Sequence, residues 1–394
     1  LKPLEAAITA PTIRPDGQLL QQPGYDQHSK LLLDLPEAAY IPEQPNLQQC
    51  EQALIRLMRP FLEFPFCSEL DWAVMLSGCL TAACRCSLPT APGFGFDAPV
   101  QASGKTLLAR SLSILATGQE PSVWPHTAGR DDEEIRKRLF SALREGSRAI
   151  VWDNVLGIFD SASLASALTS SQYRDRVLGK SESQQVPNKA LFMLTGNNLC
   201  LAGDLPRRVL ICRVDPGTAR PYARQFDLDP ALYVQTRRQE MVEAALTLIR
   251  GALVHAASPA PGRMASFEQW DGLVRQTVCW ISEQPFARGM FGDVMQAVDL
   301  AASGDPEQEA LYNLLSELYA MFGETQVSSQ EILQRAQAKD GLMECLRDLA
   351  GGDAPRSSKG LGRLLRYRKD RIVGEYVLKM QKRMNVRVWK VQKK

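Results

Sequence analysis

One stretch of the chain, FDAPVQASGKTLLARS at residues 96–111, constrains its fold more than any other. It passes through Ser103, Gly104, Lys105 and Thr106 and continues directly into an apolar, helix-forming segment. A loop that holds phosphates needs exposed backbone N–H groups, a lysine for the β- and γ-phosphates and a hydroxyl group for Mg²⁺. All three are present here, so the sequence predicts a phosphate-binding loop between a strand and a helix.

This stretch departs at one position from the strict pattern G-x-x-x-x-G-K-[ST], because Pro99 stands where the pattern has its first glycine. An ordinary helix N-terminus without a ligand is the alternative interpretation. We expect the phosphates of a nucleotide to be bound by the end of the stretch, which comprises Ala102, Ser103, Gly104, Lys105, Thr106 and Leu107.

Length and composition exclude several classes of protein. The 394 residues are enough for about two or three domains with substantial cores. The nine cysteines are odd in number and scattered, and the chain has only three histidines, so we expect reduced thiols and no zinc-type site. The chain has neither a signal segment nor an apolar run near the roughly 18 residues of a membrane helix, which predicts a cytoplasmic protein without a membrane partner. It opens on Leu1 and not on Met, as a piece of a longer protein would.

Charge is distributed unevenly along the chain. Residues 355–394 contain fourteen Lys and Arg against Asp370 and Glu375, so this segment carries +12. Because the whole chain carries only +2, the other 354 residues carry −10. A basic module on an acidic body indicates a polyanionic partner, most often nucleic acid.

The order of apolar runs and turn signals divides the chain into four segments. Residues 1–90 predict a small β-meander followed by helices. Residues 91–216 alternate apolar strands with helices, which predicts an α/β fold with a parallel sheet covered on both faces. Residues 217–303 are helical, with one amphipathic helix expected at 229–256, and residues 304–394 have the order of a winged-helix module, helices followed by a β-ribbon.

Polar residues follow the predicted strands of the second segment. Asp153 ends the apolar run IVWD about fifty residues after Lys105, the spacing of a Walker B acid that binds Mg²⁺. Many ATPases have a glutamate next, to polarise the attacking water, but this chain has Asn154. The general base is therefore left open between Asp153, acting through its water shell, and Glu133 or Glu134, for which a place in the first turn of a helix is the favoured interpretation.

Two further motifs lie downstream. Asn197 follows the next apolar strand, in the sequence TGNN, where a side-chain amide can touch the γ-phosphate and the nucleophilic water. Arg207 and Arg208 precede the strand after that, and an arginine there can stabilise the charge that develops in a neighbouring subunit's site. A solvated pair of arginines is the alternative.

Taken together, DAPVQASGKT, IVWDN, LTGNN and LPRRV resemble the Walker A, Walker B, sensor 1 and arginine-finger motifs of AAA+ P-loop ATPases. They are most similar to the superfamily 3-like helicases of phages, plasmids and integrated mobile elements, which are often fused behind a primase. The opening APTIRPDG and PGYD and the basic C-terminal module resemble the flanks of that helicase. The resemblance assigns Lys105 and Thr106 to phosphates and Mg²⁺, Asp153 to the metal, Asn197 to sensor 1 and Arg208 to the finger.

Such helicases thread single-stranded DNA through a six-membered ring and grip it with a β-hairpin that precedes sensor 1. The matching segment here is residues 174–189, with two strands expected around a turn at 179–183. It presents Arg174, Arg176, Lys180 and Lys189, which suit phosphate contacts without base readout. A hairpin that only pairs subunits is the alternative.

The C-terminal module offers a second expected DNA surface. Lys359, Arg363 and Arg366 cluster on one predicted helix, which can bind duplex at a fork or an origin. A solvated basic tail is the alternative.

The sequence thus predicts an ATP- and Mg²⁺-dependent DNA helicase that forms a homo-oligomeric ring, expected to be a hexamer, and replicates a mobile element, with a primase as a possible partner. Two other readings stay open. One is a replication initiator or helicase loader that does not separate strands, and the other is an inactive P-loop scaffold in which Pro99 and Asn154 mark lost hydrolysis.

Overall fold

The computed structural model describes residues 2–394 apart from 126–131, 178–181, 219, 225, 257, 304–305, 339, 351 and 384–385. The chain divides into two compact units, Leu1–Ala301 and Ala302–Lys394. In the described part, the helices are all too short or too polar to cross a lipid bilayer.

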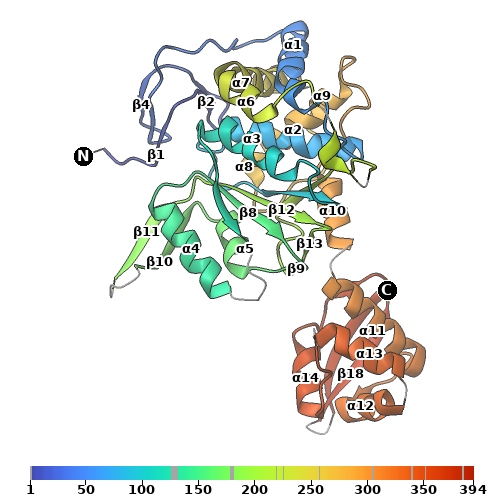
Figure 1. Ribbon diagram of the computed structural model, residues 1–394. Helices are drawn as coiled ribbons and strands as arrows, with labels where there is room; N and C mark the ends of the chain where they lie inside the picture. Colours follow the sequence, from blue (N-terminus) through green and yellow to red (C-terminus); the bar gives the residue numbers. More distant parts are fainter. Residues whose placement is uncertain are drawn as a thin grey trace. The chain divides into compact units, whose positions relative to one another are not determined.

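A five-stranded sheet forms the centre of the first unit, with the order β14-β6-β12-β8-β7 and every neighbouring pair parallel. Its strands are β6 (Gly93–Ala98), β7 (Ser122–Pro125), β8 (Ala149–Val155), β12 (Leu191–Asn197) and β14 (Val209–Arg213). The predicted parallel α/β sheet is therefore confirmed. Because β12 lies between β6 and β8, the residues that end these three strands meet at one edge of the sheet (Figure 1).

Helices cover both faces of this sheet. Figure 1 shows α2 (Glu69–Cys84) and α3 (Lys105–Thr117) on one face, and α4 (Asp132–Arg144) and α5 (Ala162–Leu168) on the other. The helix α2 is buried almost all round, as expected from its apolar sequence, and its first turn is capped by the Ser68 hydroxyl, which accepts from the Asp71 backbone N–H at 3.3 Å.

Outside the helix α2 lies a second helical layer. The expected single helix at residues 229–256 is wrong, because α6 (Pro230–Thr236) and α7 (Arg238–His255) are separated at Arg237, whose φ of −120° leaves the helical range. The other helices here are α1 (Leu47–Met58), η1 (Arg59–Phe61), η2 (Pro221–Ala223), α8 (Glu268–Trp270), the π-helical turn η3 (Asp271–Arg275), α9 (Gln276–Glu283) and α10 (Met295–Ser303).

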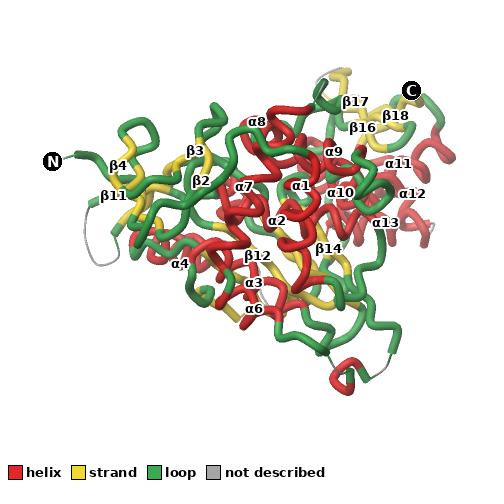
Figure 2. The backbone as a smooth tube through the Cα atoms, turned by 90° about the horizontal axis from the view of Figure 1, so that it is seen from above, coloured by secondary structure: helices red, strands yellow, loops and turns green. Residues whose placement is uncertain are grey.

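The N-terminal strands are not the simple meander that the sequence predicts. The strands are β1 (Ala6–Ile8), β2 (Thr12–Ile13), β3 (Leu19–Leu20), β4 (Gly24–Asp26) and β5 (Leu31–Leu33), and Figure 2 shows them together at one end of the unit. Although β2 pairs with β3 and β4 with β5 in antiparallel fashion, β1 pairs with β5 in parallel. The β2–β3 hairpin lies outside that sheet, and its Thr12 hydroxyl donates to the Ala83 carbonyl of α2 at 2.9 Å.

The second unit has its own apolar core. Its elements are α11 (Pro306–Phe322), β15 (Val327–Ser328), α12 (Ser329–Ala338), α13 (Asp340–Ala350), α14 (Ser358–Arg366), β16 (Ile372–Val373), β17 (Tyr376–Arg383) and β18 (Val386–Lys393). The strands form an antiparallel sheet in the order β15-β18-β17-β16. Leu314, Leu346 and Trp389 are buried together in this core, and the Trp389 indole N–H donates to the Ser329 hydroxyl at 2.9 Å.

Candidate functional site

The loop between β6 and α3 has the backbone of a phosphate-binding turn. Ala102 and Gly104 both have positive φ, +58° and +91°. A Cβ atom on Gly104 would lie 2.8 Å from the Cε1 atom of Phe64, so this position has room only for glycine. The Ser103 hydroxyl donates to the Val100 carbonyl at 2.6 Å and closes the turn. Pro99 immediately precedes these residues, and the loop curls without a glycine at that place.

The lysine and asparagine predicted for this site lie together. The ammonium group of Lys105 donates to Asn197 Oδ1 at 2.7 Å and to the Val100 carbonyl at 2.9 Å. Burial lowers the pKa of Lys105, while the nearby carboxylates of Asp97 and Asp153 oppose that shift. A buried cation with two oxygen partners can exchange them for the oxygens of a phosphate.

Oxygen ligands for a divalent cation lie one strand away. The hydroxyl groups of Thr106 and Thr195 both donate to Asp153 Oδ1, at 2.9 and 2.8 Å. One carboxylate and hydroxyl oxygens suit Mg²⁺, which keeps several waters and takes its other ligands from substrate phosphates. Among the described residues there is no group of three or more His, Cys, Asp or Glu side chains that could hold a metal ion. Thr195 was not predicted as a site residue, and only its place in TGNN, at the end of a strand beside β8, indicates it.

The residues considered for water activation differ in their surroundings. Asn154 lies in β8 with a φ of +57°, where the pairing of β8 with β12 shifts its register, and its backbone N–H donates to the Thr195 hydroxyl at 3.0 Å. Glu133 and Glu134 lie in the first turn of α4 and pair with Lys137 and Arg138 four residues later, each at 2.9 Å. Those ion pairs agree with the helix-turn interpretation of the two glutamates.

The two arginines before β14 are held differently. Arg208 is largely buried; its guanidinium donates to the Ala165 carbonyl of α5 and pairs with Asp204 at 2.9 Å. Arg207 also pairs with Asp204, at 2.6 Å, but 62% of its side chain is exposed. Burial lowers the pKa of Arg208, as does the neighbouring Arg207, while Asp204 opposes the shift. Of the two, Arg207 is the one presented to solvent.

A second charged pair lies beneath the loop and was not predicted. Asp97, at the end of β6, is buried; it accepts from the Leu199 backbone N–H at 2.7 Å and pairs with the guanidinium of Arg213. Arg213 ends β14, the strand next to β6, and also donates to Asn198 Oδ1 at 3.3 Å. Since Asn198 directly follows Asn197, this pair links the strand before the loop to the predicted sensor.

A pocket of about 400 Å³ opens beside the phosphate loop. Ala102, Ser103, Gly104 and Leu107 form one wall, so four of the predicted nucleotide-binding residues line it. Most of the other lining residues are aromatic or apolar, namely Pro60, Phe64, Pro65, Pro221, Tyr222, Phe226, Leu228 and Pro230, and Glu63, Arg224 and Asp229 add charged groups. A largely apolar pocket with a few polar groups, adjoining the predicted phosphate loop, has the size and chemistry to take a nucleobase.

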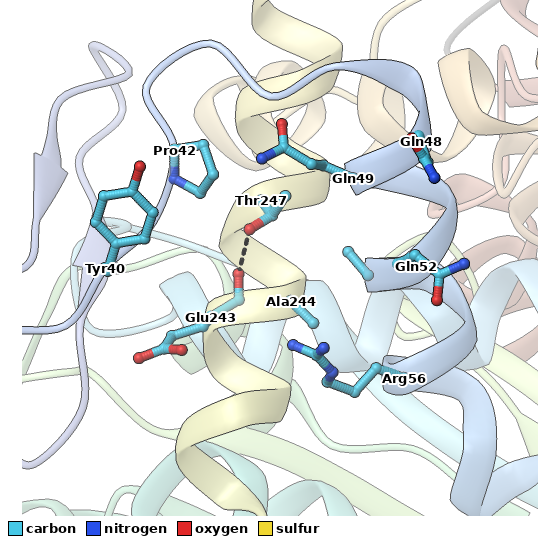
Figure 3. Close-up of a pocket in the computed structure, with 10 residues that line it drawn as sticks. Tyr40, Pro42, Gln48, Gln49, Gln52, Arg56, Glu243, Ala244 and Thr247 are labelled. Carbon is cyan, nitrogen blue, oxygen red and sulfur yellow. Dashed lines mark hydrogen bonds between the residues drawn. The ribbon is translucent and has the colours of Figure 1, made fainter.

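A second pocket, of about 290 Å³, lies between α1 and α7. Figure 3 shows Gln48, Gln52 and Arg56 of α1 on one side and Glu243 and Thr247 of α7 on the other. None of its lining residues comes from the sheet, so this pocket is separate from the edge that carries the predicted chemistry.

The predicted hairpin consists of β10 (Gln172–Arg176) and β11 (Ser183–Pro187), which pair in antiparallel fashion. Arg174 and Arg176 are exposed, whereas Tyr173 and its register partner Val186 are buried on the other face. Lys180 lies outside the described residues. Lys189, predicted as part of the exposed set, is instead half-buried and donates to the Leu88 carbonyl at 3.4 Å, because it follows the hairpin at the base of β12.

Two sets of basic residues in the second unit differ in their surroundings. Lys359, Arg363 and Arg366 are exposed on α14 at positions i, i+4 and i+7, opposite the buried Leu361 and Leu365. By contrast, Arg368 and Arg371 bind Glu307 of α11 at 3.3 and 2.9 Å and so stabilise the unit itself. The predicted residues of α14 therefore lie on one open helix face.

No protein-family model and no curated protein sequence matches this chain. Among solved structures, the chain is similar to an apo form of the NrS-1 C-terminal region, with a TM-score of 0.37 and 9% identity over 90% of this chain and 76% of that chain. It is similar to SCCmec type IV Cch, described as an active helicase, with a TM-score of 0.34 and 10% identity over 87% and 74% of the two chains. It is similar to JCV helicase, with a TM-score of 0.27 and 14% identity over 65% and 66%. With TM-scores this low, function has to be inferred from the geometry of the site itself.

Proposed function

We propose that this chain is an ATP-dependent DNA helicase of the AAA+ type that acts as a homo-oligomeric ring. The observation that carries the proposal is the meeting of Lys105, Thr106, Asp153 and Asn197 at the shared edge of β6, β8 and β12. A phosphate-binding lysine, a metal-binding pair and a polar sensor are the parts that phosphoryl transfer from ATP requires.

ATP binding exchanges the partners of these side chains. The phosphate oxygens replace Asn197 Oδ1 and the Val100 carbonyl as acceptors from Lys105, and the adenine enters the pocket beside Gly104 and Leu107. Asn197, once released by Lys105, is free to bond the γ-phosphate or the attacking water. Thr106 and Asp153 would hold Mg²⁺, which when bound neutralises charge on the β- and γ-phosphates.

The attacking water needs a proton acceptor. Asn154 is an amide and does not supply one, and the glutamates of α4 are engaged in ion pairs. We therefore assign this role to Asp153, through its water shell, the carboxylate already at the site.

Neighbouring subunits complete the site. Arg207 and Arg208 supply positive charge to the γ-phosphate bound by the adjacent chain, in a ring proposed to be a hexamer. The exposure of Arg207 favours it as the contacting residue, with Arg208 anchoring the pair to α5, a reversal of the order that the sequence resemblance implies.

DNA contacts are assigned to two surfaces. The exposed face of the β10–β11 hairpin, with Arg174 and Arg176, grips the backbone of single-stranded DNA. The second unit, helices followed by an antiparallel ribbon, is proposed as a winged-helix domain whose α14 binds duplex DNA at the fork.

Strand separation on a labelled forked DNA tests the proposal. The protein should release the displaced strand with ATP and Mg²⁺, and should release none with a non-hydrolysable ATP analogue. Binding to one duplex sequence without strand release would favour a replication initiator or loader. Nucleotide binding without turnover would favour the inactive P-loop scaffold.

A further inference from the structure

A buried carboxylate lies directly below the phosphate loop. Asp97 ends the strand that leads into the loop, is only 3% exposed, and has two partners, the Leu199 backbone N–H and the Arg213 guanidinium. A buried charge is stable only when it is paired and hydrogen-bonded. The charged partner of Asp97 is Arg213 of the adjacent strand β14, and the two residues are in register.

Arg213 is itself held in place from the other side. Its backbone N–H donates to Asp71 Oδ1 at 2.6 Å, and Asp71 also accepts from the Ser68 hydroxyl at 2.6 Å at the start of α2. Its side chain is 43% exposed, so the guanidinium lies between a buried carboxylate and solvent at the edge of the sheet. This arrangement fixes the direction of the guanidinium toward the nucleotide edge.

The same guanidinium controls the turn after the sensor strand. Arg213 donates to Asn198 Oδ1 at 3.3 Å, Asp97 accepts from Leu199, and the Asn198 backbone N–H donates to the Ala98 carbonyl at 3.1 Å. Asn198 has a φ of +51°, a conformation that needs such support. Three bonds therefore hold the residues that follow Asn197 against the end of β6.

The Asp97–Arg213 ion pair also affects the net charge at the phosphate loop. Asp97 is close enough to Lys105 to favour its charged form. Without Arg213, the unpaired Asp97 carboxylate would attract the Lys105 ammonium group away from the nucleotide. It would also repel the phosphates of an incoming nucleotide. Arg213 neutralises that carboxylate, so the loop presents a net positive charge.

We propose that Arg213 is a positioning residue of the nucleotide site, which neutralises Asp97 beneath the phosphate loop and fixes the turn that follows Asn197. The proposal rests on the proposed ATP site. It predicts two separable effects of Arg213, one on nucleotide affinity through charge and one on turnover through the position of Asn197.

Comparing the 394-residue chain carrying Arg213→Met with the same variant to which Asp97→Asn is added separates these effects. We expect Arg213→Met to weaken binding of a fluorescent ATP analogue about tenfold or more and to lower kcat. Adding Asp97→Asn should restore the affinity to within about threefold of wild type, because the charge is gone and an amide oxygen still accepts from Leu199, while kcat stays low. Arg110→Met, which breaks the Arg110–Glu120 ion pair on α3, is the matched control and should change neither value.

The outcomes distinguish the inference from the function on which it rests. A wild-type protein that neither binds nor hydrolyses ATP refutes the proposed function. A wild-type protein that binds ATP, together with an Arg213→Met variant that binds it equally well, refutes only the role of Arg213, as does a folded double variant whose affinity is not restored. If Arg213→Met fails to fold, Arg213→Lys and the double variant provide the test. Both should bind ATP with nearly the wild-type affinity, and only the double variant should have a lowered kcat. Equal kcat for the double variant and the wild type overturns the positioning role.

Discussion

Gly104 sets the shape of the phosphate loop through its backbone alone. Its φ of +91° lies in the left-handed region, and its missing side chain leaves space for the ring of Phe64 against the loop. The ring of Phe64 also lines the pocket assigned to the adenine. A change at Gly104 therefore disturbs the loop and the pocket together, before any charged group is altered.

Gly104→Ala should weaken ATP binding at least about tenfold, because the new Cβ would lie 2.8 Å from Phe64 Cε1 and the ring or the loop must shift. Gly146→Ala is the matched control, since Gly146 has a similar φ of +83° and nothing within 4 Å of an added Cβ. Both variants should lose about 1–2 kcal/mol of stability from the left-handed backbone, measured by thermal unfolding. Calorimetric titration with ATP should separate them, and equal affinities would contradict the assigned loop geometry.

The sequence predicts some residues of the candidate site and gives no signal for others. Lys105, Asp153 and Asn197 each follow an apolar strand, so their spacing and chemistry predict a shared site before the strand order is known. Asp97 and Arg213 give no such signal, because their pairing exists only through the adjacency of β14 and β6, which are far apart in the sequence. Placing a buried ion pair requires the order of strands in the sheet, and a pattern of apolar runs does not contain it.

Hydrogen bonds connect the β10–β11 hairpin to Arg208. Arg136 of α4 binds Asp175 of β10 at 3.2 Å, and Asp132, at the start of the same helix, accepts from the Ser161 hydroxyl at 2.6 Å and from the Ser163 hydroxyl at 2.7 Å. These serines begin α5, the helix whose Ala165 carbonyl accepts from Arg208. Helices α4 and α5 thus join the hairpin to Arg208, an arrangement suited to the proposed coupling of the hairpin to the nucleotide of an adjacent subunit.

Arg174→Ala combined with Arg176→Ala should lower the DNA-stimulated ATPase rate about tenfold and leave the basal rate within about twofold of wild type, because phosphate contacts are lost and the ATP site is intact. Gln185→Ala is the control, since Gln185 is the exposed register partner of Arg174 on the same face of the hairpin. Steady-state ATPase assays with and without single-stranded DNA make the measurement. Equal stimulation in the double variant and the wild type would assign the hairpin to subunit pairing instead.

Some elements could not be predicted from the sequence for local reasons. The helix α13 is not separated from α12 by any signal in the sequence, which predicts only helices followed by a ribbon for this unit. Its buried Leu342, Leu346 and Leu349 have helical spacing, but the segment is short and directly follows α12. In the same way, the parallel pairing of β1 with β5 joins two segments on either side of the β2–β3 hairpin, and no local pattern contains it.

At the scale of the whole molecule, the two units have opposite net charges and separate cores. The second unit carries the basic segment 355–394, and its core around Leu314 and Trp389 uses only its own residues. The aromatic ring of Tyr367 lies beside the Arg366 guanidinium, with 5.1 Å between the Arg366 Cζ atom and the ring centroid, at the end of the open face of α14. A cationic helix face with an adjoining aromatic ring is suited to contact with a nucleic acid backbone.

Replacing Lys359, Arg363 and Arg366 together by Ala should reduce affinity for duplex DNA and flatten its salt dependence, by about 0.9 in the slope of log K against log salt for each lost phosphate contact. Basal ATP hydrolysis should not change, because these residues lie in the other unit. Lys393→Ala is the control, since the Lys393 ammonium is engaged by Glu375 at 2.9 Å. Fluorescence anisotropy over a range of salt concentrations makes the measurement, and an unchanged slope in the triple variant would identify α14 as a solvated surface.

The central claim is that one ATP site, built around Lys105, powers movement on DNA. ATPase rates of wild type and Lys105→Ala, each with and without single-stranded DNA, test it most directly. The account predicts that DNA accelerates hydrolysis by the wild-type protein and that Lys105→Ala loses about 10²-fold or more of both rates while remaining folded. A folded Lys105→Ala variant that hydrolyses ATP as fast as the wild type would contradict the assignment of this site.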